Sequence, residues 1–313
     1  MMLNKEKNFA SAVIYVHNAE LRIKTFLQTI MAVMEENFEH SEIICVNDAS
    51  DDNSLGVIRE VSKLANSASV SIVNMSYFHG LELSMKAGMD LAIGDFVFEF
   101  DNTILDFAPQ EVMRIYRKSL EGYDIVSASA DRKERFASCV FYRIFQRYTK
   151  LSHKITTESF RILSRRVINR VDAMNKTIPY RKVIYASCGL KTDNIRYRVT
   201  CQYAETTDKR EKKFRTDLAI DSLILFTRIG YSFSKLMTIC MMLMSLFMTV
   251  YSIAIYVTAS PVTGWTTTIL FLSVAFFGLF GILTVVIKYL QLLIDLVFKR
   301  KQYSFESIEK LTR

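Results

Sequence analysis

The chain has 313 residues, of which 50% are hydrophobic and 23% are charged, and its formal net charge is +8. This composition argues for one soluble domain joined to a membrane part and against two ordinary soluble domains. The five cysteines show neither a CxxC pair nor a metal-ligand spacing, which fits reduced thiols without a site.

Short apolar runs and helical repeats alternate through the first hundred residues. Strands are predicted at 11–16, 41–48, 70–75 and 95–100, and helices at 19–36, 54–66 and 81–93. This alternation predicts an α/β fold, a parallel sheet with helices on both faces. Ligands of such sheets bind at the carboxyl ends of the strands. Three of these ends are polar, at 17–18, 47–52 and 101–103.

Basic residues gather in segments 131–150, 164–170 and 208–215. A basic surface can serve nucleic acid or anionic membrane, and the long apolar stretch near the C-terminus favours membrane lipid and no nucleic acid. Segment 136–151 has helical periodicity, which fits either an interfacial helix or a helix packed on the core. Segment 217–236 is a second amphipathic stretch and is expected to lie at the membrane interface.

The long stretch from 236 to 287 contains no Asp, Glu, Lys or Arg. Within it, 236–258 and 268–287 are each long enough to cross a bilayer, and a turn with Pro261 and Trp265 lies between them. We predict a transmembrane hairpin; the alternative is a buried helical hairpin of a soluble protein. The Gly-containing face at 276–283 would allow close helix packing, which is compatible with a homo-oligomer.

Basic residues flank both outer ends of this hairpin, and its connecting loop has none, which predicts that both termini are cytoplasmic. The N-terminal segment lacks a signal-peptide core, so the first 230 residues are expected to stay in the cytoplasm. The predicted divisions are a cytoplasmic domain at 1–205, a juxtamembrane segment at 206–235, the hairpin at 236–293 and a cytoplasmic tail at 294–313.

Four segments resemble the motifs of one known family. They are SAVIYVHNAE at 11–20, VNDASDDNS at 46–54, GLELSMKAGMDLAIGDFVFEFD at 80–101 and SFRILSRRVINRV at 159–171. Their order and spacing are similar to those of family 2 glycosyltransferases of GT-A fold. The chain most resembles the membrane-bound polyprenyl-phosphate glycosyltransferases, which include dolichol-phosphate mannose synthases and undecaprenyl-phosphate glucosyltransferases, and the resemblance covers most of it.

The resemblance implies a Rossmann-like GT-A domain for a nucleotide sugar, followed by the transmembrane hairpin. It implies transfer of a sugar from a nucleotide sugar, expected to be a UDP-sugar, to polyprenyl phosphate. The reaction would serve cell-surface glycan synthesis or modification, at the cytoplasmic face of a bacterial inner membrane. The cofactor it implies is Mg²⁺ or Mn²⁺.

The resemblance also implies site residues. The catalytic residues are expected to be Asp101, Glu158 and Arg161. Nucleotide-sugar contacts are expected from Val16, Asn18, Asp48, Asp52, Gly80 and Asp101. Lipid-phosphate contacts are expected from Arg132, Arg135, Arg161 and Arg165. The expected metal ligand is Asp101.

Elementary chemistry supports these roles and offers alternatives to them. The charges of a nucleotide diphosphate must be met by a cation, basic side chains or backbone N–H groups, and Asp101 at a strand end offers oxygen ligands. Asp48 and Asp52 fit nucleotide contacts or, alternatively, turn and helix-cap roles. The arginines suit bidentate phosphate binding or, alternatively, attraction to anionic lipid. Gly88 and Gly94 are interpreted as packing and turn glycines.

Some positions depart from the family pattern. The usual D-x-D is Asp101-Asn102-Thr103, Asn47 replaces the first acid of a D-D pair, and the acid expected before Phe160 is Ser159, with Glu158 one place earlier. Two main hypotheses follow: an active transferase, or a degenerate GT-A membrane protein that binds a nucleotide or a partner subunit without turnover. A transferase with another membrane acceptor is the third.

Overall fold

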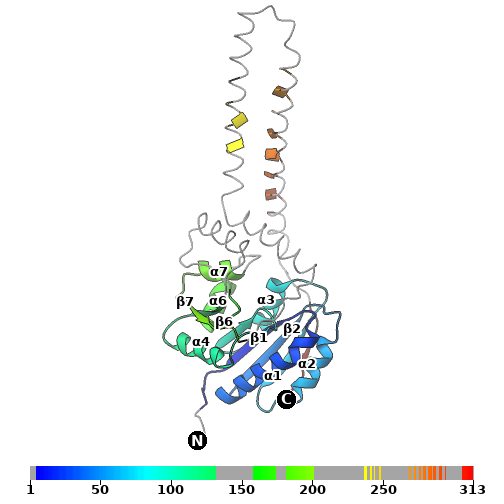
Figure 1. Ribbon diagram of the computed structural model, residues 1–313, viewed down its shortest axis with the longest axis vertical. Helices are drawn as coiled ribbons and strands as arrows, with labels where there is room; N and C mark the ends of the chain where they lie inside the picture. Colours follow the sequence, from blue (N-terminus) through cyan, green and yellow to red (C-terminus); the bar gives the residue numbers. More distant parts are fainter. Residues whose placement is uncertain are drawn as a thin grey trace, which may run out of the picture. The chain divides into compact units, whose positions relative to one another are not determined.

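A computed structural model describes residues 5–131, 158–173, 181–200 and 305–312, together with scattered helical positions between 236 and 293. The chain divides into two compact units (Figure 1). The first comprises Met1–Gln146, Lys150–Leu218 and Lys301–Arg313, and the second Arg147–Thr149 and Ala219–Arg300. The candidate site lies in the first unit, which is described below.

The first unit is built on an eight-stranded sheet in the order β7-β5-β6-β4-β1-β2-β3-β8. The strands are β1 (Ala10–Val16), β2 (Ser41–Asn47), β3 (Ser69–Met75), β4 (Phe96–Phe100), β5 (Ile125–Ala130), β6 (Phe160–Ser164), β7 (Thr192–Tyr197) and β8 (Phe305–Lys310). β1 pairs in parallel with β2 and β4, as do β2 with β3 and β5 with β7. β6 is antiparallel to β4 and β5, and β8 is antiparallel to β3. The mainly parallel sheet confirms the predicted α/β class.

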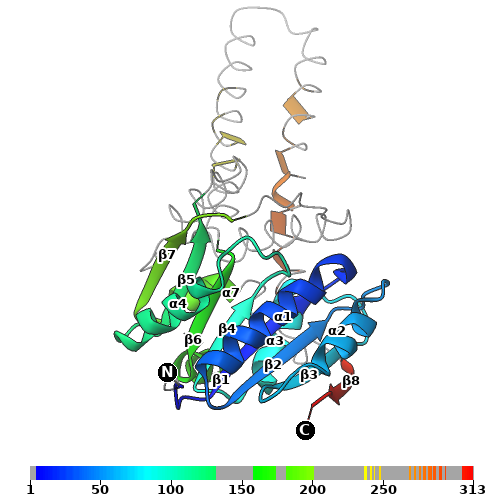
Figure 2. The same cartoon turned by 60° about the horizontal axis from the view of Figure 1, so that its bottom comes forward.

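Helices cover both faces of this sheet (Figure 2). They are α1 (Glu20–Asn37), α2 (Ser54–Ser62), α3 (Leu81–Leu91), α4 (Gln110–Leu120), α6 (Arg165–Ala173) and α7 (Arg181–Ser187). α1, α2 and α4 contribute to one apolar cluster, and α3, α6 and α7 contribute to the other. Because both its faces are covered, β1 is buried at all seven positions, which explains its continuous apolar run.

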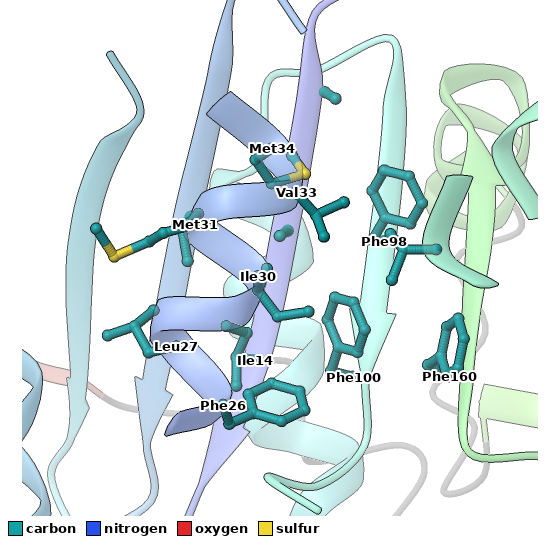
Figure 3. Close-up of a cluster of buried hydrophobic side chains, with 14 of the residues drawn as sticks. Ile14, Phe26, Leu27, Ile30, Met31, Val33, Met34, Phe98, Phe100 and Phe160 are labelled. Atoms are coloured by element: carbon teal, nitrogen blue, oxygen red, sulfur yellow. The ribbon is translucent and has the colours of Figure 1, made fainter. Parts of the chain in front are cut away.

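The first apolar cluster is rich in aromatic rings (Figure 3). Phe26 of α1 meets Phe100 of β4 edge to face, with ring centroids 5.5 Å apart. Phe100 also stacks on Phe160 of β6 at 5.5 Å. These contacts join the parallel strands to the antiparallel ones, so they hold the ends of β4 and β6 in a fixed relation.

Gly88 of α3 fits the predicted packing role. A Cβ atom there would lie 2.5 Å from Val13 and 2.6 Å from Val46, both of which are buried. We expect Gly88→Ala to lower the free energy of unfolding by about 1–3 kcal/mol, because the sheet and the helix must separate slightly. Urea denaturation of the purified protein would measure the change.

Gly56 of α2 provides the matched control. The three atoms nearest its added Cβ all belong to the side chain of Asn53, which is exposed and makes no capping hydrogen bond. Gly56→Ala should leave stability unchanged or raise it by up to about 1 kcal/mol, because alanine favours a helix. Equal losses in the two variants would contradict the packing role of Gly88.

The end of the chain joins the sheet. The sequence predicts a tail at 294–313, and the structure places β8 within it, paired with the edge strand β3. Arg59 donates two hydrogen bonds from one nitrogen and one from another to the Glu309 carboxylate, at 2.8–3.1 Å. The sequence around β8 does not predict that it pairs with β3, because β3 lies more than 200 residues earlier in the chain.

None of the helices in the described part of the chain is long and apolar enough to span a membrane. The predicted spans at 236–258 and 268–287 lie mostly outside the described residues. The amphipathic segments at 136–151 and 217–236 fall outside them too, except for residue 236. The hairpin and the interfacial helices therefore stay predictions.

Candidate functional site

The loops that follow β1 and β2 are tied together at the carboxyl edge of the sheet. Asn18 and Ala49 have the left-handed φ values 46° and 48°. The Asn18 N–H donates to Ser50 Oγ at 3.1 Å, and the Asp51 N–H donates to Asn18 Oδ1 at 2.9 Å. Asparagine tolerates the left-handed region better than most residues, while alanine needs such support from its surroundings.

Asp52 has the helix-capping role that the sequence left open as an alternative to nucleotide binding. Its Oδ2 accepts the N–H of Glu20 at 2.9 Å, at the start of α1, and its Oδ1 accepts the N–H of Ser54 at 3.0 Å, at the start of α2. Burial alone would raise the pKa of Asp52, but hydrogen bonds from Ser54 and Glu20 outweigh it and lower the pKa. Asp52 thus satisfies donors of two helix ends.

Asp48 is fully buried at the end of β2 and anchors a turn. Its Oδ1 accepts the N–H of His79, and its Oδ2 accepts the N–H of Gly80, both at 2.8 Å. Tyr15 donates its hydroxyl to the same Oδ2 at 3.0 Å. Gly80 has φ 81°, a backbone conformation that glycine adopts without strain. Asp48 therefore holds the β3–α3 loop against the ends of β1 and β2.

Aromatic rings cover this loop. Tyr77 stacks on His79 with centroids 4.0 Å apart, and His17 lies 4.8 Å from Phe78 in a tilted pair. Tyr77 is 62% exposed. The carbonyl of the predicted contact residue Val16 accepts the N–H of Asp48 at 2.9 Å. The carboxyl edge of the sheet beside Asp48 thus presents the exposed ring of Tyr77, in a loop that hydrogen bonds to Asp48 hold in place.

A second polar cluster lies at the end of β4, around Asp101. Arg161 Nη2 donates to Asp101 Oδ2 at 2.7 Å, and Arg181 Nη2 donates to Oδ1 at 2.8 Å. The same two arginines donate to Glu99, at 3.0 and 2.7 Å. Tyr185 donates its hydroxyl to Glu99 at 2.7 Å. Both carboxylates are therefore shared between two guanidinium groups.

Two further carboxylates complete this Asp101 cluster. Arg181 Nε donates to Glu82 Oε2 at 2.8 Å, and Arg161 Nε lies 3.1 Å from Glu158 Oε2 without the alignment of a hydrogen bond. The four carboxylates outnumber the two guanidinium groups, and Lys182 lies near enough to act on Asp101 electrostatically. The Arg161 and Glu99 side chains are 1% and 0% exposed, so their charges are shielded little by water.

Burial and charge shift the pKa values of this cluster in opposing directions. Burial alone would raise the pKa of Asp101, but Arg161 and Arg181 hold it well below its usual range. Burial would lower the pKa of Arg161, but Asp101 and Glu158 raise it above its usual range. Burial and the neighbouring Glu99 both raise the pKa of Tyr185. Asp101 and its two arginines therefore stay ionised at neutral pH.

The predicted metal role of Asp101 does not fit this arrangement. Both of its oxygens already accept hydrogen bonds from guanidinium groups, which repel a divalent cation. Asp106, a second carboxylate on the same loop, accepts the Tyr197 hydroxyl at 2.8 Å. Within the described ranges, no group of three or more His, Cys, Asp or Glu residues could hold a metal ion.

The structure gives the predicted phosphate-binding arginines different contacts. Arg161 is engaged by three carboxylates, as described above. Arg165 donates to the carbonyls of Ala92 and Gly94, so it fixes the turn before β4. Arg132 and Arg135 lie outside the described residues. Neither Arg161 nor Arg165 presents a guanidinium group that is unpaired.

Sequence reasoning missed Glu82, Glu99, Arg181 and Tyr185. Glu99 carries a usable signal, because a charged residue inside the apolar run FVFEF of a buried strand must have a partner. Arg181 and Tyr185 carry none, because their positions in the chain do not reveal that α7 approaches β4. Their recognition required the tertiary structure.

Comparison with known proteins gives consistent matches. The family model described as Glycosyl transferase family 2 matches residues 11–172, just over half of the chain. An uncharacterized glycosyltransferase of Bacillus subtilis, YkcC, is 28% identical over 269 residues, covering 83% of this chain and 81% of that protein. An undecaprenyl-phosphate 4-deoxy-4-formamido-L-arabinose transferase of Aeromonas hydrophila is 29% identical over 126 residues, covering 40% of this chain and 38% of that protein.

Solved structures are less similar to this chain in sequence than these relatives are. A glucosyl-3-phosphoglycerate synthase of Mycobacterium tuberculosis has a TM-score of 0.49 at 14% identity, over 71% of this chain and 81% of that chain. Its complex with Mn²⁺, UDP-glucose and phosphoglyceric acid has a TM-score of 0.47 at 13% identity, over 69% and 79% of the two chains. The metal and the sugar nucleotide belong to that complex.

Proposed function

Because the chain belongs to glycosyl transferase family 2 and is a glycosyltransferase, we propose that it transfers a sugar from a UDP-sugar to polyprenyl phosphate. In this reaction an oxygen of the lipid phosphate attacks the anomeric carbon. A bond forms between them as the bond from that carbon to the nucleoside diphosphate breaks. The lipid phosphate is already ionised near neutral pH, so no strong general base is needed.

The observation that carries the proposal is the pair of polar clusters at the carboxyl edge of the sheet. In the order β4-β1-β2-β3, the strands that follow β1 are added first on one side of it and then on the other, and ligands of α/β sheets bind at such a switch point. Asp101 follows β4 and Asp48 follows β2, so two strand spacings, or about 10 Å, separate these strand ends. A nucleotide sugar can span that distance, with its base toward Tyr77 and its sugar toward Asp101.

Sequence features support the lipid acceptor and the membrane location. One relative is named an undecaprenyl-phosphate transferase, and the stretch from 236 to 287 lacks charged residues. We propose that this stretch anchors the chain in the bacterial cytoplasmic membrane, with the transferase domain on the cytoplasmic side. Arg132 and Arg135, in a basic segment, are proposed to meet the lipid phosphate.

A second candidate function is nucleotide or partner binding without turnover. The engagement of both Asp101 oxygens by arginines favours it, as does Thr103 in place of a second carboxylate. If the second candidate binds a nucleotide, both candidates predict nucleotide binding. They then differ in whether the sugar is transferred.

A transfer assay separates them. The full chain in detergent would be mixed with polyprenyl phosphate and labelled nucleotide sugars, with Mn²⁺, Mg²⁺ or EDTA, and label entering the lipid phase would be counted. We expect transfer from one UDP-sugar and a loss of at least about 100-fold in Asp101→Asn, because misplacement of the cluster disturbs the reacting groups.

Asp131→Asn is the matched control, since the Asp131 side chain is 64% exposed and its ion pair with Arg196 is 3.9 Å long. It should keep full activity. Absence of transfer from every donor, with folded protein and a related active transferase working in parallel, would favour the binding function. Activity unchanged in Asp101→Asn would reject a role for that residue.

A further inference from the structure

Three polar side chains lie in a row across neighbouring strands, close to the carboxyl edge. Asn47 of β2 is directly opposite Asn74 of β3, and Asn74 is directly opposite Ser307 of β8. Asn74 Nδ2 donates to Ser307 Oγ at 2.9 Å, and Asn47 Nδ2 donates to Asn74 Oδ1 at 3.2 Å. This Ser307–Asn74–Asn47 row connects the end of the chain to the strand that precedes Asp48.

The row continues into the loop after β2. Asn47 Oδ1 accepts the N–H of Ser50 at 3.3 Å, and Ser50 Oγ accepts the N–H of Asn18 at 3.1 Å. Ala49, between Asp48 and Ser50, has the left-handed backbone described above. Since a non-glycine residue keeps that conformation only when its surroundings impose it, the hydrogen bond from Ser50 to Asn47 is one of the constraints.

Burial makes this row sensitive to loss of one member. Asn47 and Asn74 are 4% and 6% exposed. A buried amide that loses its partner keeps the cost of desolvation without the compensating bond, so it tends to reorient. Removal of the Ser307 hydroxyl leaves Asn74 with the longer contact to Glu309, at 3.4 Å. The loss is therefore expected to reach Asn47 and the loop after it.

We propose that β8 is a positioning element of the donor site, and that Ser307 acts through Asn74 and Asn47 on the loop at 47–52. This inference rests on the proposed function, in which the nucleotide binds beside that loop. Asn74 and Ser307, which are 233 positions apart in the chain, would thus both affect the affinity for the nucleotide. Ser307 and Asn74 are positioning residues and need not touch the ligand.

Thr312 gives a matched control at the opposite end of the β3–β8 pair. Its hydroxyl accepts the N–H of Val70 at 2.7 Å, at the start of β3 and away from the carboxyl edge. Thr312→Ala removes this hydrogen bond and a longer one, at 3.3 Å, that the Thr312 hydroxyl donates to the Ala68 carbonyl. It should lose at least as much stability as Ser307→Ala, and only Ser307→Ala should disturb the 47–52 loop.

The test measures binding of UDP to the full chain by isothermal titration calorimetry. We expect the Kd to rise about fivefold in Ser307→Ala and about tenfold in Asn74→Ala, which also leaves Asn47 without its acceptor. Ser307→Thr keeps the hydroxyl and should restore the wild-type Kd. An unchanged Kd in Ser307→Ala, or an equal rise in Thr312→Ala, would overturn the inference.

Hydrogen exchange supplies a readout that needs no ligand. Amide protection at 47–52 should fall about tenfold in Ser307→Ala and stay unchanged in Thr312→Ala. Unchanged protection in both variants would overturn the inference even if UDP binds. If the folded wild-type chain does not bind UDP while exchange responds as expected, the UDP donor proposal fails and the coupling of β8 to the loop stands.

Discussion

Arg161→Met is expected to lower the free energy of unfolding by about 3–5 kcal/mol, because it takes one of two guanidinium partners from the buried carboxylates of Glu99 and Asp101. Arg161 contacts Glu99 at 3.0 Å and Asp101 at 2.7 Å, and its side chain is 1% exposed. Methionine is shorter but occupies a similar volume, so the change mainly removes charge and hydrogen bonds. Urea denaturation at pH 7 would measure the loss.

Arg166→Met is the matched control five residues along the same segment. The Arg166 side chain is 70% exposed, and its ion pair with Asp124 is 3.8 Å long, so its loss should cost less than about 1 kcal/mol. Arg161→Lys should fall between the two, because it keeps the charge and loses the planar fork that reaches two carboxylates. Equal losses in Arg161→Met and Arg166→Met would contradict the buried cluster.

The second large effect is a pH-dependent cost of Asp101→Asn. The pKa of Asp101 is lower in the folded chain than the value of about 4 expected when it is unfolded. Its ionised carboxylate therefore stabilises the fold fully above that unfolded value, and this contribution is lost as the pH falls toward the folded pKa. At pH 7 the variant should be less stable by on the order of 2 kcal/mol.

Denaturation of wild type and Asp101→Asn from pH 7 to pH 3 would measure this effect. The difference in unfolding free energy should be constant down to about pH 5 and shrink below about pH 4, where the unfolded carboxylate takes up a proton. Asp131→Asn, at an exposed position, should differ from wild type by less than about 0.5 kcal/mol at neutral pH. A difference that grows on acidification would have the wrong sign for the proposed ion pairs.

The Asp101 cluster also bears on the two candidate functions. An ion-paired Asp101 needs no metal to stay ionised, and Glu99 of β4 holds both of its arginines, while Glu82 of α3 holds Arg181. Such a cluster can orient a reacting sugar, and it can equally serve as a rigid part of a binding protein. Turnover, measured as described above, is the property that distinguishes these functions.

Local patterns in the sequence determined the first half of the fold. Strand and helix periods in 11–100 depend on which residues face the core, and those patterns predicted β1 to β4 and α1 to α3. Strand ends are also local, so Asp48 and Asp101 were found at the carboxyl edge without coordinates. Three of the four family-like segments, at 11–20, 46–54 and 80–101, lie in these strands and helices and the loops that join them.

Tertiary structure decided the partners of these residues. Asp101 meets Arg181 from a helix 80 residues later, and Asn74 meets Ser307 from a strand 233 residues later. Such pairs leave no spacing pattern, because the chain between them can have any length. The sequence therefore predicted a carboxylate at the strand end, and the fold determined that two arginines hold it, because charges buried at such a depth must be paired.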